Sequence, residues 1–135
     1  MTERPKTVLV TDDDDDILAI VSMMLEFEGY RITTAHDGLE ALDRIQKEMP
    51  DLILLDMKMP RMSGWEFAAE YEARYGSRRD RAPIIVMTAA EHAAKRAAEI
   101  GATSCLPKPF SADQLAGKVR AFVGQGLGAP APAMR

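Results

Sequence analysis

The run Asp51-Leu52-Ile53-Leu54-Leu55-Asp56, residues 51–56, places four consecutive apolar side chains between two carboxylates. A continuous apolar run of this length is typical of a strand that is covered on both faces, as strands of parallel sheets are. Pro50 ends the helical pattern before the run, and Pro60 and Gly64 mark a loop after it. The stretch therefore predicts a buried central strand with Asp56 at its carboxyl end.

Four further apolar runs have the same character, and amphipathic segments separate all five. The other strands are expected at 8–10, 30–34, 84–87 and 103–106, and the helices at 16–28, 37–48, 65–75, 91–100 and 111–123. Strands that alternate with helices need right-handed crossovers, which build a parallel sheet with helices on both faces. The sequence therefore predicts one doubly wound α/β domain over residues 1–123. Residues 124–135 lack apolar periodicity and are predicted to form a flexible Gly/Ala/Pro tail.

Apolar positions at helical spacing predict which face of a helix is buried. The stripe in the first helix comprises Ile17, Ile20, Val21, Met24 and Leu25. Leu18 and Met23 lie off this stripe and are expected to be exposed. In the second helix, Leu39, Leu42 and Ile45 are expected to point inward.

Side chains that can do chemistry stand at the predicted carboxyl ends of four strands. They are Asp12 and Asp13 after the first strand, Asp56 after the third, Thr88 after the fourth and Lys108 after the fifth. Because these strand ends meet at one edge of a parallel sheet, the side chains are expected to share one pocket. Close carboxylates repel one another unless a cation is bound, and oxygen ligands favour Mg²⁺, or Mn²⁺, over zinc. Lys108 and Thr88 suit the oxygens of a phosphoryl group, so the pattern predicts a phosphoryl-transfer site.

Four sequence motifs, in this order, resemble the receiver domain of two-component response regulators, of the single-domain chemotaxis-regulator type. They are VLVTDDDDDI at 8–17, DLILLDMKMPRMSG at 51–64, PIIVMTA at 83–89 and LPKPF at 106–110. The resemblance covers about residues 6–123. It implies a flavodoxin-like sheet with strand order 2-1-3-4-5.

The resemblance also implies a function for the domain. Asp56 would be the phosphoacceptor, and the phosphoryl group would come from a phosphohistidine on a sensor histidine kinase or a histidine phosphotransfer protein. The chain would then be a stand-alone signalling protein that catalyses only its own phosphorylation and dephosphorylation, and it would act by binding a downstream protein.

The same resemblance assigns roles to the other residues of the pocket. Asp13, Asp56 and the backbone carbonyl of Lys58 would bind Mg²⁺ directly, and Asp12 would hold the metal through water. Thr88 and Lys108 would contact the phosphoryl oxygens, and a cis bond from Lys108 to Pro109 would aim the lysine into the pocket. Cys105 stands where most receiver domains have an aromatic residue, which puts the usual aromatic switch in doubt.

Two alternatives remain open at this point. The first is a small phosphohydrolase that uses Asp12 and Asp14 as a DxD pair, although Asp56 would then lack a role. The second is a receiver-like docking module that works without phosphorylation. By contrast, Asp14, Asp15 and Asp16 are expected to serve as the cap and first turn of the helix that follows, because carboxylates favour helix N-termini.

Composition limits the class of protein and its partners. The formal net charge of −4 makes a nucleic-acid backbone an unfavourable partner. Cys105 is the only cysteine, so an internal disulfide is excluded. The N-terminal residues lack the apolar stretch of a signal peptide, and the apolar runs are too short to cross a bilayer. These features predict a cytoplasmic protein without a membrane segment.

Overall fold

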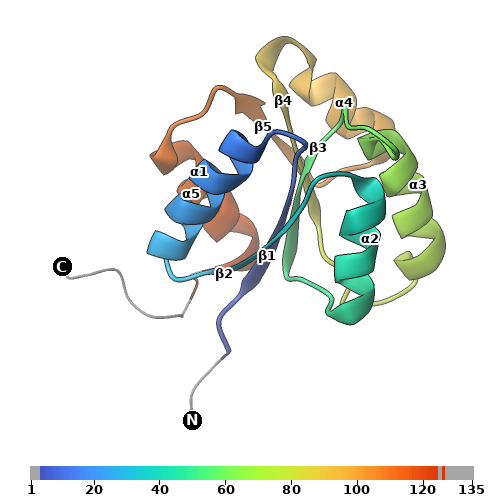
Figure 1. Ribbon diagram of the computed structural model, residues 1–135, viewed down its shortest axis with the longest axis horizontal. Coiled ribbons are helices and arrows are strands. Elements are labelled where there is room, and N and C mark those ends of the chain that lie inside the picture. The colour runs from blue at the N-terminus through green and yellow to red at the C-terminus, as the bar shows by residue number, and fades with distance from the viewer. Residues whose placement is uncertain (1–3, 125, 127–135) are drawn as a thin grey trace.

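A five-stranded parallel sheet forms the middle layer of the structure, a computed structural model that describes residues 4–124 and 126 (Figure 1). The strands are β1 (Thr7–Thr11), β2 (Arg31–Ala35), β3 (Leu52–Asp56), β4 (Ile84–Ala89) and β5 (Ser104–Lys108). Their order is β2-β1-β3-β4-β5, which confirms the predicted flavodoxin-like topology. β1 and β3 are neighbours, with Thr11 opposite Leu55, so the residues that follow both strands emerge close together.

Helices cover both faces of the sheet. α1 (Asp15–Phe27) and α5 (Ala112–Val123) lie on one face, whereas α2 (Gly38–Lys47), α3 (Gly64–Tyr75) and α4 (Ala93–Ile100) lie on the other (Figure 1). A short 3₁₀ helix, Ala90–His92, connects β4 to α4. This arrangement is the predicted doubly wound domain.

Side chains satisfy the free backbone amides at the start of four helices. The N-cap residues are Asp14 for α1, Asp37 for α2, Ser63 for α3 and Ser111 for α5. Asp14 accepts hydrogen bonds from the amides of Asp16 and Ile17, which confirms its predicted capping role. Each such cap typically contributes about 1 kcal/mol to stability.

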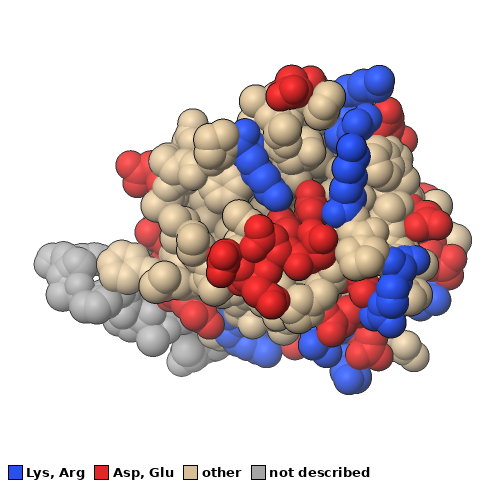
Figure 2. All heavy atoms as spheres, turned by 45° about the horizontal axis from the view of Figure 1, so that its top comes forward, with Lys and Arg blue, Asp and Glu red and all other residues tan. Residues whose placement is uncertain are grey.

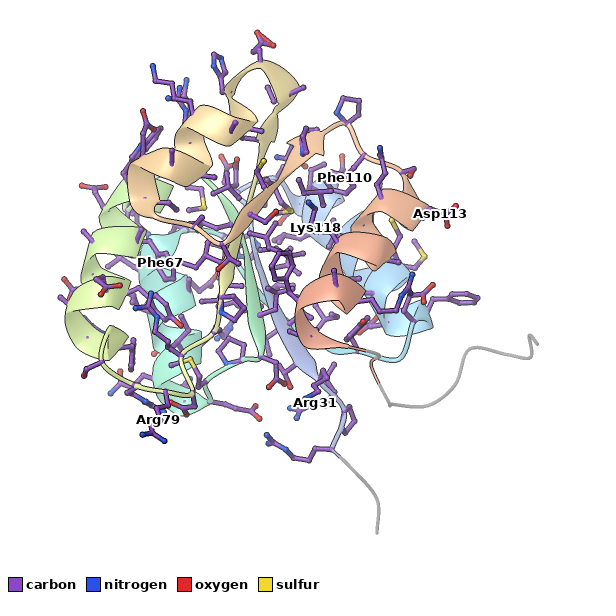
Figure 3. The ribbon with its side chains drawn as sticks, turned by 180° about the vertical axis from the view of Figure 1, so that it is seen from behind. Arg31, Phe67, Arg79, Phe110, Asp113 and Lys118 are labelled. Carbon is purple, nitrogen blue, oxygen red and sulfur yellow. The ribbon has the colours of Figure 1, made fainter. Side chains whose placement is uncertain are left out.

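The strands alternate their side chains between two apolar cores. Val10 and Leu54 pack towards α1 and α5, whereas Leu9 and Leu55 pack towards α2 and α3. Phe67 lies fully buried in the second core, between α3 and the sheet (Figure 3). Because both faces are covered, the interior positions of the central strands are apolar, and polar side chains such as Thr11 and Asp56 stand at the strand ends.

The predicted inward faces of two helices need correction. Leu18 is only 5% exposed and belongs to the core, whereas Ile20 is 44% exposed. The reason is that α1 packs through Leu18, Val21 and Leu25, so its buried face is rotated from the predicted stripe. Met23 is exposed, as predicted. In α2, Leu39 is 44% exposed, because the helix packs through Ala41, Leu42 and Ile45.

The predicted flexible tail, residues 124–135, falls mainly outside the described residues. Of its residues, Gly124 and Gly126 are described. The carbonyl of Gly126 accepts a hydrogen bond from the amide of Lys6 (2.9 Å), and the carbonyl of Gly124 accepts one from the hydroxyl of Tyr30 (2.6 Å). A Cβ atom at Gly126 would collide with the backbone of Gly29, so this close approach requires glycine. Within the described ranges, none of the helices is long and apolar enough to span a membrane.

Thr11, at the end of β1, has a side-chain hydroxyl that is buried without a hydrogen-bond partner among the described residues. An unsatisfied buried polar group typically costs about 1–3 kcal/mol. We therefore expect Thr11→Val, which replaces the hydroxyl with a methyl group of similar size, to raise the free energy of unfolding by about 1 kcal/mol. Urea unfolding at neutral pH measures the effect. Thr33→Val, at a half-buried position of β2, is the control and should change the free energy of unfolding by less than Thr11→Val does. A destabilised Thr11→Val protein would contradict the prediction.

Candidate functional site

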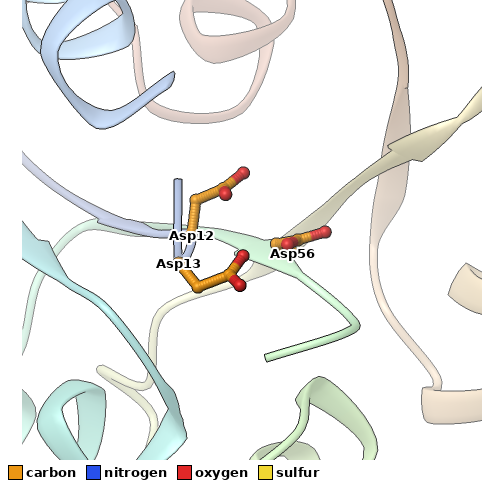
Figure 4. Close-up of side chains that lie close together, drawn as sticks. All are labelled: Asp12, Asp13 and Asp56. Carbon is orange, nitrogen blue, oxygen red and sulfur yellow. The ribbon is translucent and has the colours of Figure 1, made fainter. Parts of the chain in front are cut away.

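Three carboxylates meet at the carboxyl edge of the sheet. Asp12 and Asp13 follow β1, and Asp56 is the last residue of the adjacent β3. Each offers an oxygen within 4.8 Å of the others, and Figure 4 shows the three carboxylates turned towards the same space. The predicted grouping of these residues is therefore present in the fold.

The three side chains differ in their access to solvent. Asp12 is 1% exposed and its Oδ1 accepts a hydrogen bond from the amide of Asp14 at 2.9 Å, whereas Asp13 is exposed. Asp56 lies between these extremes, with 14% of its side chain exposed. Figure 2 shows the acidic side chains gathered in the middle of this face, with lysine or arginine side chains beside them. A set of oxygen donors that opens to water on one side fits a hard divalent cation such as Mg²⁺.

Lys108, the last residue of β5, places a positive charge beside the carboxylates. Its Nζ lies 2.9 Å from Oδ2 of Asp12 and 3.7 Å from Oδ1 of Asp56. Burial pulls the pKa of Lys108 down, but the hydrogen bond to Asp12 and the charge of Asp56 outweigh burial and raise the pKa above its ordinary value. The ammonium is therefore charged at neutral pH and bridges two of the three acids.

One ammonium does not balance three carboxylates. Burial, followed by the charge of Asp12, raises the pKa of Asp56 from 3.8 to about 6, although Lys108 and the amide of Met57 act in the opposite direction. The carboxylate of Asp56 is consequently ionised at neutral pH at a cost in free energy. A second positive charge close to Asp56 would relieve this cost.

The other two predicted site residues, Thr88 and Lys58, belong to segments that follow or end neighbouring strands. Thr88 is half-buried near the end of β4, opposite Pro107 in the register with β5. Lys58 lies in the loop that follows Asp56. Among the described residues, no hydrogen bond joins the Thr88 side chain or Lys58 to the three carboxylates, so their roles stay predictions. The bond between Lys108 and Pro109 is cis, as the resemblance implied.

Comparison with known proteins agrees with this geometry. A family model described as the response regulator receiver domain matches residues 8–120. The chain belongs to this family. Response regulator MprA of Mycobacterium avium is 39% identical to this receiver domain over 118 residues, which are 86% of the chain and 50% of MprA. The chain thus spans about half the length of the curated relatives it matches.

Solved structures show the same similarity. A putative response regulator from Chloroflexus aurantiacus is 30% identical to this chain, and the two structures superpose with a TM-score of 0.79. The match covers 89% of this chain and 98% of that one. The response regulator protein TrrA of Thermotoga maritima, solved in complex with Mg²⁺ and BeF, is 35% identical with a TM-score of 0.75, and the match covers 87% and 98%.

A salt bridge attaches the loop after Asp56 to the second helix of this receiver domain. Nε of Arg61 donates to Oδ2 of the buried Asp37 at 2.7 Å, and the amide of Gly38 donates to the carbonyl of Met62 at 3.0 Å. Burial pushes the pKa of Asp37 up, but hydrogen bonds from Arg61 and the Glu40 amide outweigh it and lower the pKa. The loop beside the site is therefore held against α2.

Sequence reasoning missed this salt bridge. The sequence placed Asp37 at the start of the second helix, but it gave no sign of a partner in the loop after Asp56, where Arg61 has a positive φ of 63°. Non-glycine residues adopt this conformation rarely, so no local preference indicates where the arginine side chain points.

His36, an exposed residue of the receiver domain, connects two of the segments around the site. Its Nε2 lies 2.9 Å from Oδ1 of Asp15 on α1, and its Nδ1 lies 2.8 Å from Oε1 of Glu40 on α2. The hydrogen bonds to Glu40 and Asp15 raise the pKa of His36 above 6.5. No local sequence pattern links His36 to its two acidic partners, because they come from different elements.

Proposed function

We propose that this receiver domain accepts a phosphoryl group on Asp56 and signals through phosphorylation-dependent binding to another protein. The observation that carries the proposal is the position of the Asp56 carboxylate. It lies beside two further carboxylates, and the Lys108 ammonium is 3.7 Å away. A nucleophile, a site for a divalent cation and a fixed positive charge are the components that phosphoryl transfer needs.

The donors of the pocket fit Mg²⁺. Asp13, Asp56 and the backbone carbonyl of Lys58 would hold it directly, and Asp12, which is already engaged by Lys108, would hold it through water. The chemistry that a bound Mg²⁺ supplies is neutralisation of the negative charge on the phosphoryl oxygens. All these donors are oxygens, and the exposed Asp13 leaves room for water in the coordination shell.

The chain's own residues have defined tasks in the transfer. With a pKa of about 6, Asp56 is mainly ionised at neutral pH and its carboxylate oxygen can attack phosphorus. The bond between phosphorus and the donor histidine nitrogen breaks, and its electron pair leaves with the imidazole. Lys108 stays charged and stabilises the added negative charge, while the Thr88 hydroxyl donates a hydrogen bond to a phosphoryl oxygen.

The partners follow from this chemistry. The donor would be a phosphohistidine on a sensor kinase or a phosphotransfer protein. Phosphorylation replaces the single negative charge of the Asp56 carboxylate with a phosphoryl group that carries about one and a half to two. Lys108 and Thr88 would move towards this group, which shifts an existing equilibrium between inactive and active states. The phosphohydrolase alternative loses support, since the Asp14 side chain already accepts hydrogen bonds from the amides of Asp16 and Ile17.

Intact-mass measurement after incubation with acetyl phosphate and Mg²⁺ tests the proposal. We expect a gain of about 80 Da, one phosphoryl group, in the parent protein and none in Asp56→Asn. Asp113→Asn, at an exposed position on α5, is the control and should gain the same mass as the parent.

Two results would count against Asp56 as the phosphoacceptor. Mass gain that persists in Asp56→Asn would place the modification elsewhere. A parent protein that neither gains mass nor binds beryllofluoride in the presence of Mg²⁺ would favour the phosphorylation-independent docking module.

A further inference from the structure

α4 is weakly anchored in the fold. Of its eight residues, all of which the structure describes, only Ala93 is buried. Trp65, the only tryptophan of the chain, supplies a polar contact to this helix from α3: its Nε1 donates to Oε1 of Glu99 at 2.8 Å. Ala97 and Ile100 pack against the second core but are only partly buried, so polar contacts add to what holds this helix in position.

Arg96 completes a closed set of three contacts. Its guanidinium lies over the Trp65 ring, 5.1 Å from the centroid, and its Nη1 lies 3.4 Å from Oε1 of Glu99. The hydrogen bond from Trp65 lowers the pKa of Glu99, and the charge of Arg96 acts in the same direction. Desolvation opposes both but does not outweigh them. Glu99 is therefore an anion at neutral pH, and both of its partners favour that charge. We call Trp65, Arg96 and Glu99 the Trp65 latch.

Trp65 is also tied to the residues around Asp56. It is the second residue of α3, directly after Gly64, whose amide donates to the carbonyl of Met57 at 2.7 Å. A Cβ atom at Gly64 would lie 2.8 Å from the carbonyl oxygen of Asp56, so the two backbones are in contact. A shift of the backbone after Asp56 therefore has little room to occur without moving the start of α3.

α4 has a second connection to the same site. It follows β4, which carries Thr88, after only the short 3₁₀ helix Ala90–His92. The two ends of the latch thus lead back to the pocket by different routes, one through the loop after Asp56 and one through the end of β4. An element with this placement can respond when the pocket is filled.

We propose that the Trp65 latch transmits occupancy of the Asp56 site to α4. The inference rests on the proposed function, because a phosphoryl group at Asp56 supplies the occupancy. With the pocket empty, the latch is closed and α4 is held on α3. Filling the pocket moves the loop after Asp56 and the end of β4, the Trp65–Glu99 hydrogen bond breaks, and α4 becomes mobile.

Hydrogen exchange of the α4 amides, with and without beryllofluoride and Mg²⁺, tests the latch. In the parent protein we expect exchange over residues 93–100 to accelerate about tenfold on addition. Glu99→Ala should exchange at the accelerated rate before addition and respond little afterwards, and Glu99→Gln, which keeps an acceptor without the charge, should be intermediate. Glu91→Ala, at an exposed site in the 3₁₀ helix, is the matched control and should behave as the parent.

Fluorine NMR of bound beryllofluoride separates the two proposals. Bound beryllofluoride with unchanged exchange of α4 in the parent would overturn the latch and leave the phosphoacceptor proposal in place. A response in Glu99→Ala equal to that of the parent would also overturn the latch. Absence of bound beryllofluoride in the parent would overturn the phosphoacceptor proposal, and transmission from Asp56 with it.

Discussion

Asp56→Asn is expected to stabilise the metal-free protein by about 2–3 kcal/mol at pH 7.5, because each unit of pKa shift corresponds to about 1.4 kcal/mol. The pKa of Asp56 is raised from 3.8 to about 6, first by burial and then by the charge of Asp12. Asparagine has nearly the same shape but no charge, so the variant avoids the cost of an ionised group at this position. A site residue whose removal stabilises the fold is maintained for function rather than for stability.

The pH dependence of this gain has a definite sign. A carboxyl group with a folded pKa above its unfolded value binds its proton more tightly in the folded state. Its stabilising contribution is fully present below pH 3.8 and is lost as the pH rises through about 6. The advantage of Asp56→Asn over the parent should therefore be largest above pH 6 and shrink towards zero near pH 4.

Urea unfolding in the presence of a chelator, at several pH values between 4 and 8, measures both effects. Asp43→Asn, at an exposed position on α2, is the control and should change stability by less than about 0.5 kcal/mol. Added Mg²⁺ should stabilise the parent more than Asp56→Asn, since the variant has lost one ligand charge. A destabilised Asp56→Asn protein at pH 7.5 would show that the carboxylate is not under strain.

The architecture was predictable because its main signals are local. Leu52 to Leu55 are apolar without alternation, which indicates a strand covered on both faces, and each such run is followed by an amphipathic segment. Parallel connectivity then determines which strand ends meet. Asp12, Asp13 and Asp56 could for this reason be grouped from the sequence, although Asp56 lies 43 residues or more from the other two.

Other features depended on packing that no local pattern encodes. The rotation of α1, which buries Leu18 and exposes Ile20, is decided by contacts with the sheet and α5. Trp65 and Glu99 are 34 residues apart, and each alone is compatible with an ordinary surface position. Polar contacts between elements require the relative placement of the helices, and hydrophobic periodicity does not specify it.

Lys108→Met is expected to lower the free energy of unfolding by about 3 kcal/mol at pH 7.5, because removal of one partner leaves a buried charge without compensation. Asp12 is 1% exposed, and its Oδ2 accepts a hydrogen bond from Nζ of Lys108 at 2.9 Å. Methionine keeps the unbranched apolar stem and removes the ammonium. Since Lys108 also lowers the pKa of Asp56, that pKa should rise further in the variant.

A double variant distinguishes lost charge compensation from lost packing. Asp12→Asn combined with Lys108→Met should recover most of the stability, since neither charge then remains. Lys118→Met is the matched control, because Lys118 is a half-buried lysine of α5 (Figure 3) whose ammonium donates a hydrogen bond to the Ser104 hydroxyl at 3.1 Å. Loss of this hydrogen bond should lower the free energy of unfolding by about 1 kcal/mol or less.

Magnesium affinity should change in the opposite direction to stability. Lys108 repels a second cation, so Lys108→Met should bind Mg²⁺ several-fold more tightly than the parent. The variant should nevertheless no longer accept a phosphoryl group efficiently, because the charge that stabilises the added oxygens is gone. Calorimetric titration with Mg²⁺ and intact-mass measurement give the two readings. Weaker Mg²⁺ binding in a folded Lys108→Met protein would show that the lysine organises the carboxylates rather than competing with the metal. Tighter binding together with lost phosphorylation would identify Lys108 as a cation placed for the phosphoryl group, one that the pocket retains even though it weakens the metal site.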